Sequence, residues 1–444
     1  MSTIKQPRGI DDGRLTTVDV QGRSIGNRKS TIENSAARYL VGGVNSPVRA
    51  FRHVGGDPLL LVGGRGATVT DTDGHEFVDF IMGWGCLILG HRPAPVVRAL
   101  QQGIRRGVLT GLTHPLEIEL ARLICEAAPS VEQVRFTASG TEACMTAVKI
   151  ARAHTGRSKI LMFDGCYHGH SDSVMALRSA GIPGLTVQET LSVPFNDPTA
   201  LEEAVRAHAR ELACVIIEPV AANMGVVIPE SGYLAMLREL TSRHGVLLIF
   251  DEVVTGFRVG YGGAQGLFGM RPDLTTFGKI IGGGLPVGAV GGARQLMQRL
   301  APEGDVYHGG TFAGHPLTMA SGAATLQALR AHPPYERIDA LAERLEAGLL
   351  DGARAAEVPV VVNRLGSMLT LFFTERPVRS LADAKASQRE RFARWAQVLR
   401  RQGILIPPSP FEALFVSAAH RAADVERFAA ASHAAMALIA EGAH

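Results

Sequence analysis

The chain has 444 residues, of which 46% are hydrophobic and 20% are charged, and this composition excludes a disordered or fibrous protein. The formal net charge of +3, with scattered basic residues, argues against a nucleic-acid or membrane-surface partner. Five widely spaced cysteines predict neither a disulfide framework nor a metal site and favour a reducing compartment. The sequence shows no signal peptide and no membrane-spanning segment, so we expect a cytoplasmic protein.

The N-terminal part predicts little regular structure before a small sheet. Residues 1–30 lack periodicity and are expected to form a loose arm, and residues 30–40 look helical. Residues 59–81 alternate apolar and polar side chains around Asp71–Gly74, which predicts a β-meander with a hairpin turn.

Two turns in this part carry candidate binding residues. Residues 42–51 include Ser46 and Arg49, a hydroxyl and a guanidinium suited to a carboxylate, although an exposed surface turn is the simpler interpretation. In residues 82–86 a large aromatic, Trp84, lies among small residues. Such a ring suits the wall of a pocket as well as a core position.

The rest of the chain divides into two regions. From about residue 110 to 290, strands alternate with helices, which predicts a mostly parallel sheet covered by helices. After it, helices near 335–356 and 380–402 flank short strands near 359–373. This last region predicts a smaller α+β domain.

One stretch of the first region carries the strongest chemical signal. Residues 246–250 form an apolar run typical of a strand buried on both faces, and the run ends in Asp251 and Glu252. Ligands of open α/β sheets bind at the carboxyl ends of strands. Lys279 follows among apolar residues and glycines, where desolvation favours the neutral, nucleophilic amine. Either residue alone could be structural; together they favour a pyridoxal phosphate (PLP) site.

A second signal is a phosphate-binding pattern. A short strand near 134–137 is followed by Ser139, Gly140 and Thr141 and then by a helix. Backbone N–H groups and hydroxyls at the positive end of a helix dipole bind phosphate. An ordinary helix cap formed by one of the hydroxyls is the alternative.

Further candidates lie at other strand ends. The strand 159–163 leads to Tyr167, whose ring could cover a planar cofactor. His168 and His170 follow it and could equally be satisfied polar residues of a turn.

Four more polar residues lie in turns or follow buried strands. Glu218 and Asn223 follow the apolar strand 214–217 and would enlarge a polar cluster. A glycine-rich turn carries Tyr307 and Thr311.

As a set, seven motifs carry a resemblance to a known family. The chain resembles the class III, fold-type I PLP-dependent enzymes, and among them the glutamate-1-semialdehyde aminomutases and their aminotransferase relatives, over about residues 30–420. The motifs are GGVNSPVRAF, RFTASGTEA, GCYHGHSD, EPVAANMGVV, LIFDEVVTGFR, PDLTTFGKIIGGGLPVGA and GGTFAGHPL.

The resemblance implies a fold and an assembly. The expected fold is α/β: a large domain with a mostly parallel seven-stranded sheet, plus a smaller α+β domain formed from the N- and C-terminal segments. The expected boundaries are an arm at 1–30, an N-terminal segment at 31–90, a PLP-binding domain at 91–320 and a C-terminal small domain at 321–444. The family is homodimeric, and its active sites are shared across the interface.

The resemblance also implies residue roles. Lys279 would form the Schiff base with PLP, Asp251 would pair with the ring nitrogen, and Tyr167 would stack on the ring. The implied cofactor-binding residues are Ser139, Gly140, Thr141, Tyr167, His168, Glu218, Asn223, Asp251, Lys279 and, from the partner subunit, Thr311. The implied substrate-binding residues are Ser46, Arg49, Trp84, Tyr307 and the lone acid Glu412. No metal is expected.

Departures from the family pattern bear on the reaction. Residues 171–193 are about ten residues shorter than the family pattern and lack its Gly-Ser-Gly lid, which would retain a reaction intermediate. Ala138, the segment 112–114 and His315 also differ from the pattern.

These departures favour an aminotransferase that moves an amino group between an amino acid donor and a small carboxylate-bearing carbonyl compound, possibly in specialised metabolism, with Arg49 as carboxylate anchor. The alternative is a glutamate-1-semialdehyde 2,1-aminomutase that makes 5-aminolevulinate for tetrapyrrole biosynthesis. An inactive PLP-fold regulator or scaffold is disfavoured, because Lys279 and Asp251 are both retained.

Overall fold

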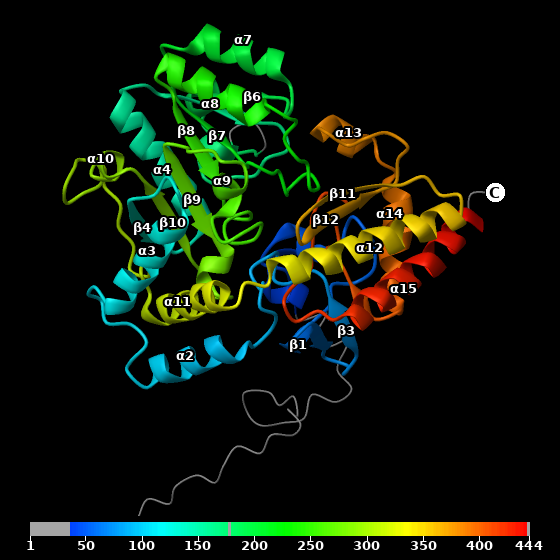
Figure 1. The fold of residues 1–444 in the computed structure, drawn as a ribbon. Helices are drawn as coiled ribbons and strands as arrows, with labels where there is room; N and C mark the ends of the chain where they lie inside the picture. Colours follow the sequence, from blue (N-terminus) through cyan, green and yellow to red (C-terminus); the bar gives the residue numbers. More distant parts are fainter. Residues whose placement is uncertain (1–35, 176–178, 442–444) are drawn as a thin grey trace, which may run out of the picture.

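The computed structural model describes residues 36–175 and 179–441 (Figure 1). The expected arm at 1–30 lies outside the described residues, as does the first half of the helix expected over 30–40. Residues 36–39 are helical.

The largest sheet contains the strands β4 (Gln133–Thr137), β5 (Lys159–Phe163), β6 (Thr190–Val193), β7 (Leu212–Ile217), β8 (Leu247–Asp251), β9 (Leu274–Gly278) and β10 (Gly288–Gly292). Their order in space is β4-β10-β9-β8-β7-β5-β6. β10 is antiparallel to both of its neighbours, and the other strands pair in parallel. The sheet is therefore seven-stranded and mostly parallel, as expected.

Helices cover both faces of this sheet. Successive side chains of a strand point to opposite faces, and apolar side chains on both faces pack against helices. Val215 and Leu248 belong to an apolar cluster with α7 (Pro198–His208) and α8 (Tyr233–His244), whereas Ile216 and Ile249 belong to a second cluster with α4 (Gly140–Thr155). The helices of this region are α2 (Ala94–Ile104), α3 (Pro115–Ala127), α4 (Gly140–Thr155), α5 (Asp172–Met175), α6 (Gly184–Gln188), α7 (Pro198–His208), α8 (Tyr233–His244), α9 (Gly263–Leu267), α10 (Arg294–Met297), α11 (Pro316–Ala331) and the 3₁₀ turn η3 (Lys279–Gly282).

Two smaller sheets form the other half of the molecule. One contains β1 (Leu61–Arg65), β2 (Thr68–Asp71), β3 (Glu76–Asp79) and β13 (Ile404–Leu405), and the other contains β11 (Val361–Leu365), β12 (Met368–Phe372) and β14 (Leu414–Phe415). β1 to β3 are the expected meander, and β13 lies parallel to β3. The N-terminal and C-terminal segments therefore share one sheet, while the exact domain boundaries stay a prediction.

The helix expected over 380–402 is interrupted. It forms two helices, α13 (Leu381–Ala386) and α14 (Arg389–Arg401), because Ser387 between them is extended, with φ −65° and ψ 145°. The Ser387 hydroxyl accepts a hydrogen bond from the Phe373 N–H, and the Gln388 N–H donates to the Phe373 carbonyl. These bonds to the end of β12 hold the break, and sequence periodicity does not reveal them.

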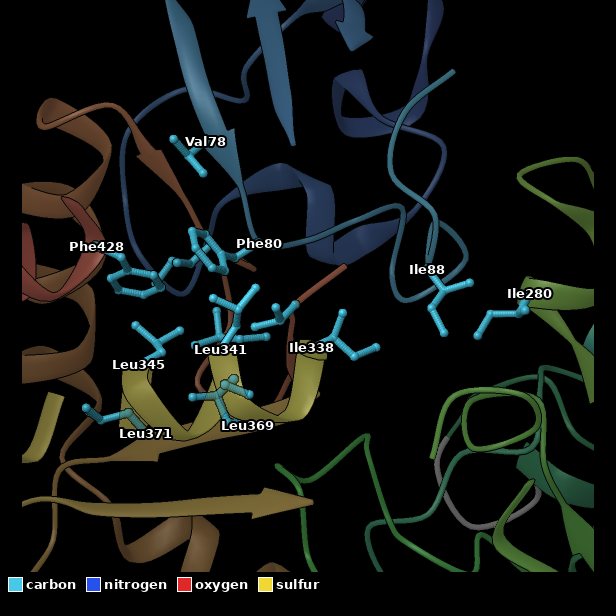
Figure 2. Packing of buried hydrophobic residues seen from close by; sticks show 14 of the residues in the cluster. Val78, Phe80, Ile88, Ile280, Ile338, Leu341, Leu345, Leu369, Leu371 and Phe428 are labelled. Carbon is cyan, nitrogen blue, oxygen red and sulfur yellow. The ribbon is translucent and has the colours of Figure 1, made fainter. Parts of the chain in front are cut away.

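The main core lies between α12 (Tyr335–Ala355), α15 (Ala422–Glu441) and the small sheets (Figure 2). Phe80 and Phe428 pack edge to face with ring centroids 4.7 Å apart, next to Leu341 of α12. The same cluster extends to Ile88 and to Ile280 (Figure 2). It therefore continues from the small domain to the turn that begins at Lys279. Among residues 36–175 and 179–441, no helix is long and apolar enough to cross a membrane.

Helix α11 packs closely against this turn. Gly322 of α11 lies directly on the backbone of Ile281, and a methyl group at position 322 would overlap the Ile281 carbonyl oxygen. Protein interiors accommodate such an overlap only by moving the backbone.

We expect Gly322→Ala to lower the free energy of unfolding by about 1–3 kcal/mol, because η3 must move away from α11. Gly266→Ala is the matched control: it also replaces a helical glycine, but no atom lies within 4 Å of the added methyl group. Denaturant unfolding of the two variants measures the difference. Equal stability of the two variants would contradict the close packing of α11 on η3.

Candidate active site

The carboxylate of Asp251 is the most constrained group of the candidate site. Asp251 ends β8 and is buried. Its Oδ2 lies 2.7 Å from Nδ1 of His168, and the thiol of Cys144 donates to the same oxygen at 3.4 Å. Its Oδ1 accepts hydrogen bonds from the Thr276 hydroxyl at 3.0 Å and the Val253 N–H at 3.1 Å. Side chains from three different segments therefore fix the orientation of one acid.

His168, one of the cofactor-binding residues that the resemblance implies, lies against Asp251. His168 is only 1% exposed, and its Nδ1 is within hydrogen-bond distance of the Asp251 carboxylate. Its Nε2 is buried and has no hydrogen-bond partner within the described chain. A polar atom without a partner beside a buried acid is suited to contact a bound polar molecule.

The Ser-Gly-Thr turn starts helix α4 as expected. The Ser139 hydroxyl caps the helix by accepting from the Glu142 N–H at 3.2 Å. The Thr141 hydroxyl lies 3.2 Å from Nδ1 of His170. Gly169 has φ +89°, and a side chain there would overlap Thr141. The turn after β5 therefore lies against the N-terminus of α4, where an anion is stabilised by the helix dipole.

Glu218 ties together the ends of β5 and β7. It is buried and accepts hydrogen bonds from the Tyr167 N–H at 2.7 Å, the Ala222 N–H at 3.0 Å and the Asn223 amide at 3.0 Å. Burial raises the pKa of Glu218. The ring of Tyr167 is 44% exposed, so it is free to stack on a planar group.

Lys279 follows the strand that is paired with the Asp251 strand. β8 and β9 are parallel neighbours, Asp251 is paired with Thr276, and Lys279 directly follows the end of β9. Lys279 has φ +48°, a left-handed conformation that costs a residue other than glycine about 1–3 kcal/mol and is typical of functional sites. The fold therefore brings the predicted acid and amine to the same sheet edge.

Electrostatic interactions place two more residues near Lys279. Burial raises the pKa of Glu412 to about 7; the Lys279 charge opposes this increase, and the Glu218 carboxylate adds to it. Burial also raises the pKa of the Cys86 thiol, and Lys279 opposes that increase as well. Since Cys86 belongs to the same turn as Trp84, this turn and Glu412 both lie on the lysine side of the site.

Four predicted site residues make no polar contact with Asp251 or Lys279 within the described part of the chain. Ser46 and Arg49 lie at the 3₁₀ turn η2 (Pro47–Ala50), and Arg49 is exposed. Tyr307 is 76% exposed and Thr311 is also exposed. None of the four is hydrogen bonded or ion paired to Asp251 or Lys279 in the described part of the chain. Their roles stay predictions.

The contacts of Glu252, Thr276 and Cys144 correct or extend the site predicted from the sequence. Glu252 points to the other face of β8, where the N–H groups of Ala264 and Gln265 and the Thr255 hydroxyl satisfy it, so its role is structural. Thr276 was missed, although its position opposite a strand-end acid was a usable signal. Cys144 was missed because nothing in its sequence context marks it.

The residues present fit PLP. A buried acid with an unpaired histidine nitrogen next to it suits a pyridinium ring, the α4 N-terminus suits a phosphate, and the adjacent lysine suits an aldehyde. The exposed face of Tyr167 leaves room for a ring.

The raised pKa of Glu412 predicts a pH effect on stability. The folded protein holds a proton on Glu412 up to about pH 7, whereas an ordinary glutamate loses it near 4.5. The contribution of this group is therefore complete below about pH 4.5 and is lost as the pH rises towards 7. We expect the wild-type protein without cofactor to lose stability relative to Glu412→Gln over this range, measured by denaturant midpoints at several pH values. A constant difference between the two proteins would contradict the shift.

Comparisons with known proteins agree with this geometry. A family model described as "Aminotransferase class-III" matches residues 52–431. The glutamate-1-semialdehyde 2,1-aminomutase of Thermomicrobium roseum is 50% identical over 420 residues, covering 92% of this chain and 98% of that protein.

Solved structures are also similar. An omega-transaminase from Sphaerobacter thermophilus superimposes with a TM-score of 0.87 and 36% identity, covering 94% of this chain and 99% of that one. A glutamate-1-semialdehyde-aminomutase from Pseudomonas aeruginosa PAO1, in complex with PMP, gives 0.83 and 29%, with 92% and 94% covered. These findings show that the chain is a fold-type I, PLP-dependent enzyme and belongs to the class-III aminotransferase family.

Proposed function

We propose that this enzyme is a glutamate-1-semialdehyde 2,1-aminomutase that forms 5-aminolevulinate. The observation that carries the proposal is the 50% identity, over nearly the whole of both chains, with the Thermomicrobium roseum aminomutase. Departures such as the segment 171–193 favoured an aminotransferase from the sequence. The full-length relatives named as aminomutases outweigh that argument, because they cover the site and both domains.

The proposal assigns the cofactor contacts to residues of this chain. Asp251, held by His168 and Thr276, pairs with the ring nitrogen, and Tyr167 covers the ring. Ser139, Gly140 and Thr141 hold the phosphate, and Thr311 of a partner subunit completes its binding. Glu218 and Asn223 form the polar surround of the ring. When bound, PLP supplies an electron sink for the bonds at the carbon that carries the amino group.

Lys279 is the proton carrier in this proposal. Its Nζ would hold the cofactor aldehyde and, when released by a substrate amine, would carry protons to and from the reacting carbons. Glu412 lies on the same side and, with a pKa of about 7, can exchange a proton with a substrate amine near neutral pH. With PLP bound, the Asp251 carboxylate would face the ring nitrogen and stabilise its protonated form.

The substrate side needs a second subunit in this proposal. Ser46, Arg49, Trp84, Tyr307 and Glu412 would line it, with Arg49 as the carboxylate anchor. Several large apolar side chains are exposed together near the turn that carries Tyr307 and near α2 and α3, which supports a homodimer. They are Ile104, Val108, Leu109, Leu112, Ile118 and Phe312. The five free cysteines fit a cytoplasmic location.

An aminotransferase is the second candidate, and one observation favours it. The segment 171–193 consists of the short helices α5 and α6 and strand β6, with residues 176–178 outside the described chain, and its sequence lacks the Gly-Ser-Gly lid. A site without such a cover retains a reaction intermediate less well.

Incubation with glutamate-1-semialdehyde as the only substrate separates the two candidates. We expect the purified PLP enzyme to form 5-aminolevulinate without an added amino donor, and added amino acids should not increase the initial rate. Product detection by mass spectrometry measures this conversion. A strict requirement for a separate donor would instead establish the aminotransferase, and inactivity with every donor would favour a scaffold.

Asp251→Asn tests the assigned role of the acid. We expect turnover to fall by at least about a hundredfold while PLP stays bound, because a neutral amide cannot keep the ring nitrogen protonated. Asp273→Asn is the matched control: Asp273 is also a strand-associated acid, but it accepts from the Leu248 N–H and pairs with Arg238 at the other end of the sheet. Turnover and bound PLP, measured by absorbance, should be normal in the control. Normal turnover in Asp251→Asn would refute the assignment.

A further inference from the structure

Arg258 is a buried cation that the proposed reaction does not use. It lies in the segment that follows β8 and is 1% exposed. Within the described chain, no carboxylate forms an ion pair with it, and burial lowers its pKa to about 10. Burying a guanidinium without a counter-ion is unfavourable, so the groups around it must compensate by specific contacts.

The contacts of Arg258 come from three separate segments. Its Nη2 donates to the carbonyl of Gly85 at 2.7 Å, and its Nη1 donates to the carbonyl of Val416 at 3.1 Å and the hydroxyl of Ser367 at 3.4 Å. Its Cζ lies 5.3 Å from the centroid of the Phe415 ring, in a cation–π arrangement. One planar, multi-donor side chain therefore connects the large domain to both small sheets.

The turn on one side of this contact needs external support. Met82, Gly83, Trp84 and Gly85 have φ values of +47°, +60°, +60° and +90°. A run of left-handed residues, two of them not glycine, is held only by surrounding structure.

Asp79 accepts from the N–H groups of Ile81 and Met82 at the start of the turn, and two further contacts support its end. The Gly85 carbonyl accepts from Arg258, and the Phe415 ring lies so close to Gly85 that an added methyl group would contact it at 2.9 Å. Arg258 and Phe415 are therefore the contacts that fix the end of the Trp84 turn from outside it.

The same contact reaches the segment that carries Glu412. β14 begins two positions after Glu412, and its residue Phe415 donates its N–H to the carbonyl of Phe80 at 2.9 Å. The Val416 carbonyl that binds Arg258 directly follows β14. Arg258 therefore contacts both the turn that carries Trp84 and the segment that follows Glu412. Trp84 and Glu412 are the two substrate-side candidates near Lys279.

We propose that Arg258 is a positioning residue that fixes the Trp84 turn and the Glu412 segment relative to each other and thereby sets the affinity for the amino substrate. Its contacts leave the groups around Asp251 untouched, so its loss weakens substrate binding more than it slows the chemistry. The kinetic part rests on the proposed function; the effect on the turn does not.

Arg258→Lys tests the proposal, because lysine keeps the charge but cannot reach the three acceptors in one plane. We expect the KM for the amino substrate to rise at least tenfold and kcat to fall less than threefold, with PLP still bound. Acrylamide quenching of tryptophan fluorescence should increase at least twofold. The chain has two tryptophans, and Trp395 is 0% exposed, so the quenching reports Trp84.

Arg157→Lys is the matched control. Arg157 also donates to backbone carbonyls, those of Leu212, His244 and Gly245, but at the other end of β7. We expect it to lower the unfolding midpoint without changing KM or quenching. A purely structural role of Arg258 predicts the same result for Arg258→Lys, and that result would overturn the proposal.

Phe415→Leu provides a second variant in case Arg258→Lys does not fold. It leaves Arg258 in place but removes the ring against Gly85, and we expect the same increases in KM and quenching, with smaller size. Unchanged quenching in this variant would also overturn the proposal. If the enzyme fails to convert glutamate-1-semialdehyde, the quenching result still decides the structural part, and KM is measured with the amino donor that supports turnover.

Discussion

The site depends on one buried carboxylate, that of Asp251, whose two oxygens are fixed by side chains from three segments. The contacts with His168, Cys144 and Thr276 hold the Asp251 side chain in one orientation at the end of β8. The parallel pairing of β8 with β9 then places the Lys279 turn at the same edge. The acid and the amine are close because two neighbouring strands end there, and the rest of the large domain supports these two strands.

Two buried charged side chains, Glu218 and Arg258, hold the loops around the site in place. Glu218 accepts hydrogen bonds from the Tyr167 turn and from Asn223, so the groups that would surround a ring share one buried acid. Arg258 joins the Trp84 turn to the end of the small domain in a comparable way. Glu218 and Arg258 thus each hold together segments that are distant in sequence. Glu218 does so on the cofactor side of the site, and Arg258 does so on the substrate side.

Much of this could be predicted from the sequence, because the signals were local. The apolar strands, the acid at the end of β8 and the Ser-Gly-Thr start of α4 all follow from patterns within a few residues. The contacts that could not be predicted join distant segments: Cys144 to Asp251, Arg258 to Gly85, and Ser387 to Phe373. The break between α13 and α14 is of the same kind, since a tertiary hydrogen bond overrides helical periodicity.

The pairing of β3 with β13 has a consequence for biosynthesis. The sheet that contains β1 to β3 lacks its fourth strand, β13, until residues 404–405 have been synthesised. All strands of the large sheet have been synthesised before then. During translation the Trp84 turn therefore lacks its contact with Phe415, and Arg258 lacks its contact with Val416, because both residues are synthesised later still. Contacts of such long sequence separation form slowly. Until then, β3 presents an unpaired strand edge, the kind of edge that can pair with another chain.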